Sequence, residues 1–154
     1  MIYGLKIRQA IVEDIEDINM IEKSIFNKNP WTKKMIKSEV ERYNYKKTLL
    51  IEGDHKIIGY LMIHFFEIEY HIINFGIKKE YQNRGIGRYF LNYFLKELPT
   101  NSSVFLEVKE SNISAINLYK KLGFVKQYIR NRYYADGSNA INLLYRKKID
   151  HGMV

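Results

Sequence analysis

A short glycine-containing segment between an apolar run and an amphipathic run constrains this chain more than any other feature. Residues 82–87 read Gln-Asn-Arg-Gly-Ile-Gly and follow the apolar segment 71–77. From about residue 85 to residue 98, apolar residues then recur at helical spacing. Glycines one residue apart let the backbone turn tightly, and a helix that starts there offers unpaired N–H groups and the positive end of its dipole. The pattern predicts a strand–turn–helix unit that cradles a pyrophosphate, although a lone Gly-x-Gly pair is also common in ordinary loops.

The composition places this unit in a domain of ordinary size. The chain has 154 residues, is 46% hydrophobic and contains no cysteine. We expect residues 1–149 to form one domain with a buried core and residues 150–154 to form a short tail. The lack of cysteine excludes disulfides, thiolate metal sites and a cysteine nucleophile. No apolar run approaches about 18 residues and the start lacks a signal-peptide core, so we expect a cytoplasmic protein with no membrane partner.

The net charge of +8 permits two interpretations. An excess of 25 Lys and Arg over 17 Asp and Glu would suit a nucleic-acid partner. The basic residues are scattered, however, and no aromatic–basic signature of nucleic-acid binding is present. We interpret the charge as a bias of a chain that is also rich in Ile, Asn and Tyr, and expect no nucleic-acid partner. The four histidines lack metal-ligand spacing, so no metal is expected.

Periodicity and turn residues divide the chain into strands and helices. Asp14 and Thr32 each precede a helical pattern and are expected to cap it. Gly53-Asp54 predicts a hairpin turn, and Gly123 a left-handed helix end. The order of the elements indicates an α/β fold with a mixed sheet. Strands are expected at about 5–9, 48–52, 57–64, 68–77, 104–108, 124–130 and 140–146, and helices at about 15–25, 32–42, 85–98 and 114–122.

A second block of sequence follows the glycine turn. Residues 106–112 read Leu-Glu-Val-Lys-Glu-Ser-Asn, and residues 115–124 read Ala-Ile-Asn-Leu-Tyr-Lys-Lys-Leu-Gly-Phe. With 82–87, these blocks resemble the GNAT family of acetyl-CoA-dependent N-acetyltransferases. Pro30-Trp31 and the segment 130–134, Arg-Asn-Arg-Tyr-Tyr, add a resemblance to its ribosomal-protein-alanine N-acetyltransferases (RimI type). The resemblance implies the GNAT fold, with a mixed, mostly antiparallel central sheet of about six to seven strands flanked by about four helices.

The resemblance also implies where acetyl-CoA binds. Backbone groups at the end of the strand would pair with the pantetheine arm, the turn would wrap the pyrophosphate, and an asparagine before the next helix would contact the cofactor. The alternatives are a plain core strand and a simple helix N-cap. The cofactor-binding residues implied in this way are Phe75, Gly76, Ile77, Gln82, Asn83, Arg84, Gly85, Ile86, Gly87, Arg88 and Asn112.

Glu107 and Tyr119 are the candidate catalytic residues. Glu107 lies in an apolar strand pattern, and alternation turns it away from the face of Leu106 and Val108. A carboxylate there is costly unless it is paired or functional, and an edge position that meets solvent is the alternative. The resemblance implies that Glu107 is the general base. It also implies that Tyr119, which at this spacing is otherwise a core residue, gives a proton to the departing thiolate.

The acceptor side depends on aromatic residues. Trp31, Tyr133 and Tyr134 match positions that flank the acceptor groove in the subfamily, although each could equally be a packed residue. Ser138-Asn-Ala140 stands where the subfamily carries an acidic pair, and Lys78-Lys79 replaces an Asp-Pro, so the peptide preference stays open. His71, at the start of the strand that leads to the cofactor, is a further catalytic candidate.

The sequence thus predicts an enzyme that transfers acetyl from acetyl-CoA to the N-terminal α-amine of a protein, with ribosomal proteins among the candidate acceptors. At about pH 7.5 roughly a third of α-amines are neutral but only about one lysine in a thousand, which favours the α-amine. The alternatives are an acetyltransferase for a lysine or a small-molecule amine, and a non-catalytic acetyl-CoA-binding module. Intact Glu107 and Tyr119 argue against the module. The sequence does not indicate an oligomeric state.

Overall fold

A computed structural model describes residues 2–41 and 44–148, and the predicted tail at 150–154 lies outside the described residues. The described part contains seven strands and four α-helices, most of them within two residues of their predicted bounds. Their bounds are β1 (Lys6–Gln9), α1 (Ile15–Ile25), α2 (Lys33–Val40), β2 (Lys46–Gly53), β3 (Lys56–Phe66), β4 (Glu69–Ile77), α3 (Ile86–Glu97), β5 (Ser103–Lys109), α4 (Ile113–Lys121), β6 (Val125–Arg130) and β7 (Ala140–Arg146), with short 3-10 turns at η1 (Val12–Asp14) and η2 (Lys79–Tyr81).

The seven strands form one sheet in the order β1-β2-β3-β4-β5-β7-β6. Among the strand pairs whose register is described, β4 and β5 run parallel and the others antiparallel. This confirms the predicted mixed, mostly antiparallel α/β fold. The chain divides into two compact units, a first unit of Met1–His64 with Ile73–Leu91 and a second unit of Phe65–Ile72 with Asn92–Val154. The assignment of residues 1–149 to a single domain stays a prediction.

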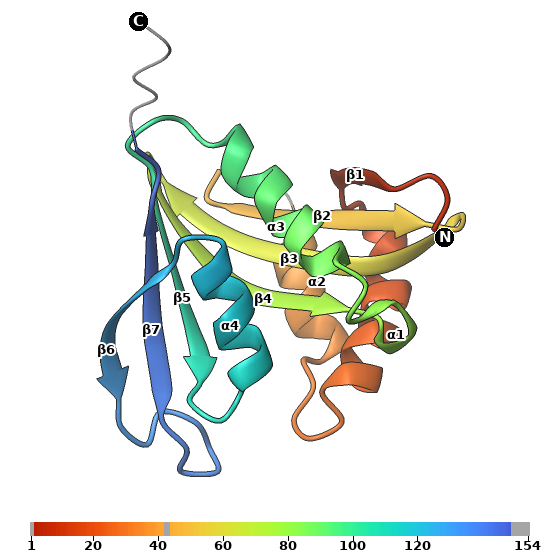
Figure 1. Cartoon of the computed structure of the whole chain (residues 1–154). Coiled ribbons are helices and arrows are strands. Elements are labelled where there is room, and N and C mark those ends of the chain that lie inside the picture. The colour runs from red at the N-terminus through yellow and green to blue at the C-terminus, as the bar shows by residue number, and fades with distance from the viewer. Residues whose placement is uncertain (1, 42–43, 149–154) are drawn as a thin grey trace, which may run out of the picture. The chain divides into compact units, whose positions relative to one another are not determined.

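The first unit builds a core between helices α1 and α2 and the strands β2 and β3 (Figure 1). Leu50 and Tyr60 are paired across these strands, so their side chains share a face of the sheet. The isoleucine stripe of α1 packs onto that face, which explains why this helix forms there. The cluster consists of Ala10, Ile18, Ile21, Ile36, Val40, Leu50, Tyr60 and Met62.

Two predicted signals at the ends of elements differ from the structure in detail: Asp14 stands at the N-cap of α1 without a side-chain cap, and the hairpin predicted at Gly53-Asp54 forms with its turn one residue later. Asp14 does not cap α1 with its side chain; its carboxylate instead accepts the Ile11 N–H at 2.8 Å and pairs with Arg8 at 2.8 and 2.9 Å. The β2–β3 turn is made by Asp54 and His55, both at positive φ, because Gly53 is still part of the strand. Thr32, by contrast, caps α2 as predicted by accepting the Met35 N–H at 3.2 Å.

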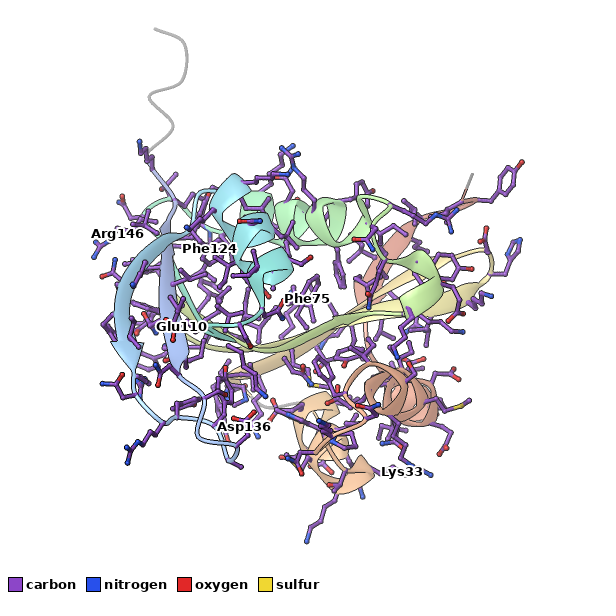
Figure 2. The ribbon with its side chains drawn as sticks, turned by 60° about the horizontal axis from the view of Figure 1, so that its bottom comes forward. Lys33, Phe75, Glu110, Phe124, Asp136 and Arg146 are labelled. Carbon is purple, nitrogen blue, oxygen red and sulfur yellow. The ribbon has the colours of Figure 1, made fainter. Side chains whose placement is uncertain are left out.

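The second unit places β5, β7 and β6 side by side, with α4 beside β5 (Figure 1). Tyr119 of α4 packs edge-on against Phe124, which lies beside the helix (Figure 2). Gly123 ends the helix at φ 103°, as predicted. In the part of the chain that the structure describes, no helix is long and apolar enough to cross a membrane.

Candidate active site

The glycine turn lies in the first unit, between the end of β4 and the start of α3. Asn83 and Gly85 both have positive φ, 60° and 80°, and this reverses the chain direction. A Cβ built on Gly85 would meet no atom within 4 Å, so the space beside it is open. Tyr89 N–H donates to Gly85 O at 3.0 Å, and the donors before Tyr89 at the helix start are those that a helix leaves without an internal acceptor. Open space and free donors fit an anionic group here.

The turn is fixed to the strand that precedes it. Gln82 Nε2 donates to Ile77 O at 2.8 Å, and Lys78 N–H donates to Ile58 O at 2.8 Å. The guanidinium of Arg84 lies 5.5 Å from the centre of the Tyr81 ring while the residue stays exposed. Arg88 on the first turn of α3 is also exposed. Both arginines are therefore available to an anion at the turn.

The end of β4 is closely packed against Tyr60. A Cβ at Gly76 would come within 2.6 Å of Tyr60 Oη, so glycine is the residue that fits. Phe75 N–H donates to Asn74 Oδ1 at 2.9 Å. Since Ile77 O accepts from Gln82, two backbone groups of this strand end already have partners within the protein. The pantetheine contacts expected at Phe75–Ile77 stay a prediction.

A buried carboxylate supports this strand end. Glu22 is 2% exposed and accepts hydrogen bonds from the Tyr60 hydroxyl, from Asn74 Nδ2 at 2.9 Å and from the Trp31 N–H at 3.1 Å. Burial first, then the Glu22 charge, raises the pKa of Tyr60, so its phenol stays a donor. One carboxylate thus joins α1, the loop that contains Trp31, and the strands β3 and β4.

Glu107 lies in the second unit with its carboxylate held at one oxygen. Oε1 accepts a hydrogen bond from Asn142 Nδ2 at 3.0 Å and forms an ion pair with Arg130, whose Nε lies 2.9 Å away. Oε2 is buried and has no hydrogen-bond partner in the described structure. The expected alternation is confirmed, because Glu107 pairs with Asn142 while Leu106 and Val108 point into the core. A carboxylate with one free buried oxygen can accept a proton there.

Tyr119 is buried within the second unit at 8% exposure. Burial, followed by the nearby Tyr134 phenol, raises its pKa to about 12, so the hydroxyl keeps its proton at neutral pH. Burial is also the largest cause that raises the pKa of Tyr134 to about 12, with Tyr133 and Glu107 adding to it. Tyr134 therefore interacts electrostatically with both candidate catalytic residues, whereas no hydrogen bond links Glu107 to Tyr119 in the described residues.

Two other candidates have local partners. Asn112 caps α4 by accepting the Ala115 N–H at 3.2 Å, which is the alternative that the sequence left open. His71 is exposed, pairs with Glu69 at 3.2 Å and stacks on the Phe105 ring. These contacts give both residues a structural role, and a contact of Asn112 with the cofactor stays a prediction.

The three aromatic residues expected near the acceptor differ in exposure. Trp31 packs against the core cluster of the first unit and is only partly exposed. Tyr133 is 50% exposed, with the Arg130 guanidinium 5.5 Å from its ring centre. Tyr134 is half-buried, with the Lys109 ammonium 5.2 Å from its ring centre, and that ammonium pairs with Asp136 in the loop of Tyr134. Tyr133 is thus the member of the set most available to a ligand.

Sequence reasoning missed the residues that hold these candidates in place. Asn142 and Arg130 bind Glu107, and Asn74 and Glu22 support the strand end beside Phe75. Asn142 gave one signal, because it interrupts the apolar run 140–144. Glu22 gave another, since it lies on the buried face of an isoleucine-rich helix. A polar residue inside an apolar pattern needs a partner, and the partner is visible only after folding.

The fold and its candidate residues define a class of protein. A strand–turn–helix unit with unpaired N–H donors fits an anionic group, and a strand carboxylate with one unpartnered oxygen is able to accept a proton. Together they are typical of an enzyme that transfers a group from a phosphate-bearing cofactor. The family model of the acetyltransferase (GNAT) family matches residues 12–124, and the chain belongs to that family. It is an N-acetyltransferase.

Relatives and a solved structure agree with this assignment. The [ribosomal protein bS18]-alanine N-acetyltransferase of Salmonella typhimurium is 33% identical over 68% of this chain and 71% of its own length. The N-alpha-acetyltransferase of Sulfurisphaera tokodaii is 29% identical over 88% of this chain and 89% of its own. The crystal structure of the ribosomal-protein-S18-alanine N-acetyltransferase from Escherichia coli superposes with a TM-score of 0.86 at 25% identity, covering 98% of this chain and 99% of that one. The recognised resemblance is thereby confirmed.

Proposed function

We propose that this chain transfers the acetyl group of acetyl-CoA to the N-terminal α-amine of a protein, that a ribosomal protein is one such acceptor, and that the reaction takes place in the cytoplasm. The observation that carries the proposal is the free buried oxygen of Glu107, in a chain similar over most of its length to named α-amine acetyltransferases. An α-amine loses its proton near pH 7.8, so a single weak base is sufficient for it.

The turn of the first unit fits the cofactor that GNAT acetyltransferases use. Residues 82–88, with open space at Gly85 and two exposed arginines, would hold the pyrophosphate. The strand end 75–77 and Asn112 would contact the rest of acetyl-CoA. Acetyl-CoA supplies the acetyl group in activated form as a thioester.

Glu107 and Tyr119 divide the proton transfers. Glu107 Oε2 takes the proton that the acceptor amine loses, because it is the carboxylate oxygen without a partner. Tyr119, whose pKa is about 12, keeps its proton and donates to the thiolate that the transfer releases. The acceptor peptide is expected to contact three aromatic side chains, Trp31, Tyr133 and Tyr134. Tyr133 contributes the most exposed ring.

A peptide panel tests the acceptor. Peptides that begin with alanine or another small residue should be acetylated, and mass spectrometry should place the acetyl group on the α-nitrogen. Since the chain has no cysteine, a thiol-reactive dye reports released CoA without background from the enzyme. Matched peptides with blocked N-termini and one internal lysine are the control and should not react.

Two outcomes would redirect the assignment. Equal rates on the blocked lysine peptides, or activity only on small amines, would replace the α-amine by one of the other acceptors. Glu107→Gln should lower turnover by about 10²-fold or more without changing acetyl-CoA affinity. Full activity of that variant would move the base to another residue.

A further inference from the structure

Two side chains from different strands converge on a single oxygen of Glu107. Asn142 of β7 donates a hydrogen bond to Oε1 across the strand pair at 3.0 Å, and Arg130 of β6 forms an ion pair with the same oxygen, with its Nε 2.9 Å away. Nothing donates to Oε2 in the described structure. The rotation of the carboxylate is therefore restricted: Oε1 has both contacts, and Oε2 has none.

A bulge in β6 brings the arginine to this side of the sheet. In the β6–β7 pair, Lys126 faces Leu143 and Tyr128 faces Asn142, so Gln127 is an extra residue without a partner. Because side chains alternate along a strand, this one insertion places Tyr128 and Arg130 on the face that Asn142 shares with Glu107. A regular strand would have turned Arg130 to the opposite face.

Both side chains are themselves held. Arg130 donates to the Tyr128 hydroxyl at 3.2 Å and lies over the Tyr133 ring. The Tyr128 hydrogen bond first, then the Glu107 charge, raises the pKa of Arg130. Asn142 is 4% exposed, and its Oδ1 has no partner within the described residues. A half-satisfied buried amide destabilises a core, so its presence here calls for a function.

We propose that Asn142 is a positioning residue for the base and that it acts together with Arg130. The two hold Glu107 by Oε1, so that Oε2 is the one atom that receives the proton of the acceptor amine. In that step an N–H bond of the ammonium breaks, its electron pair stays on nitrogen, and an O–H bond forms at Oε2. Asn142 and Arg130 keep their protons. This inference rests on the proposed role of Glu107.

Asn142 prevents a competing arrangement. An arginine guanidinium can donate to both oxygens of a carboxylate at once. Such a bidentate pair between Arg130 and Glu107 would occupy Oε2. With Oε1 shared between Asn142 and Arg130 Nε, the carboxylate is turned so that this bidentate pair does not form. Removal of the amide frees the carboxylate to rotate onto the guanidinium.

The test is Asn142→Leu, which removes the amide with little change in size. We expect kcat to fall by about tenfold or more, while KM for acetyl-CoA stays within about twofold, since only the proton transfer is affected. The melting temperature should not fall, because leucine also removes the unpartnered Oδ1. Asn139→Leu is the matched control, since Asn139 donates to Glu110 at the same 3.0 Å in the neighbouring loop. It should leave kcat unchanged.

A double-mutant cycle distinguishes this proposal from the function on which it rests. In a Glu107→Gln background, Asn142→Leu should cause no further loss of turnover, measured with any amine that the wild-type enzyme acetylates. Losses that multiply would overturn the positioning role while the base assignment stands. A fully active Glu107→Gln variant would overturn both.

A second readout does not depend on turnover. In the free enzyme, Glu107→Gln should displace the side-chain amide signals of Asn142 in a ¹⁵N NMR spectrum, because Nδ2 then loses its carboxylate acceptor. The signals of Asn139 serve as the internal reference. If the Asn142 signals were the same in the wild type and in Glu107→Gln, or if Asn142→Leu kept its full kcat, the proposal would be wrong.

Discussion

Three carboxylates of the first unit, Asp14, Glu22 and Glu39, are less than 8% exposed. Each is surrounded by donors: Asp14 by Arg8, Glu22 by Tyr60 and Asn74, and Glu39 by His64. A buried charge is tolerated when its oxygens are satisfied in this way. Glu107 in the second unit is different, because one of its buried oxygens lacks any partner in the described residues. At the scale of single residues, that difference distinguishes Glu107 from the paired carboxylates and is the reason we propose it as the base.

Asp14 allows a stability prediction. Hydrogen bonds from Arg8 lower its pKa, so Asp14 contributes stability above its unfolded pKa of about 3.9 and loses it as pH falls through the lower folded value. Asp14→Asn should lower the free energy of unfolding by about 2 kcal/mol at pH 7, and the difference from wild type should shrink below about pH 3. Urea titrations across this pH range measure it.

The control for Asp14 is Asp17→Asn, in the exposed first turn of α1. It removes the same charge near the helix start, where the dipole contribution is about 0.3–1 kcal/mol. If the two variants lost equal stability at pH 7, the contribution of Asp14 would come from the helix dipole and not from Arg8.

At the scale of elements, the turn before α3 permits a binding prediction. Acetyl-CoA at about 100 times its Kd should stabilise the wild type by roughly 2.7 kcal/mol, seen as a rise in melting temperature. Gly85→Asp should abolish the rise, because a carboxylate would occupy the open space that the phosphates need. Gly4→Asp is matched to it, since Gly4 also has positive φ and open space beside it.

Both glycine variants should lose similar intrinsic stability, about 1–2 kcal/mol for a side chain in the left-handed region. Only Gly85→Asp should lose the response to acetyl-CoA. A response that survived in Gly85→Asp would show that the pyrophosphate binds away from this turn.

Local sequence patterns predict the helices and strands, but not the contacts between distant segments of the chain. Helices and strands followed from periodicity, because a period near 3.6 or 2 is a local property. The bulge at Gln127 was missed, since neither glycine nor proline marks it and it exists only relative to β7. Asp14 stands at the N-cap of α1 but makes no side-chain cap, because Arg8, six residues earlier, binds its carboxylate. The ion pair of Glu107 with Arg130 and its hydrogen bond from Asn142 join strands that are far apart in the chain, so no local pattern predicts them.

At the scale of the whole molecule, the charge is the dominant property. A net charge of +8 attracts an anionic cofactor and repels cationic acceptors such as polyamines. Salt screens this attraction, because the Debye length falls from about 10 Å at 0.1 M to about 3 Å at 1 M. We therefore expect the Kd for acetyl-CoA to rise several-fold over that range, as measured by calorimetry.

The contribution of the two arginines near the turn can be separated from that of the overall charge. A double variant, Arg84→Gln with Arg88→Gln, should weaken binding and also flatten its dependence on salt, because both side chains are exposed near the turn. Lys33→Gln with Lys37→Gln on α2 removes the same net charge at exposed positions and should leave the dependence nearly unchanged. Equal effects of the two pairs would assign the attraction to the overall charge instead of the turn.

The extra residue in β6 has a consequence for how such an enzyme can diverge. Loss of Gln127, a deletion of one codon, would restore the regular alternation and rotate Tyr128 and Arg130 away from Glu107. The base would then lose its cationic neighbour without any change at codon 107 or codon 130. The length of a strand thus decides which charge lies beside Glu107, and an insertion or deletion can do what is usually attributed to substitution.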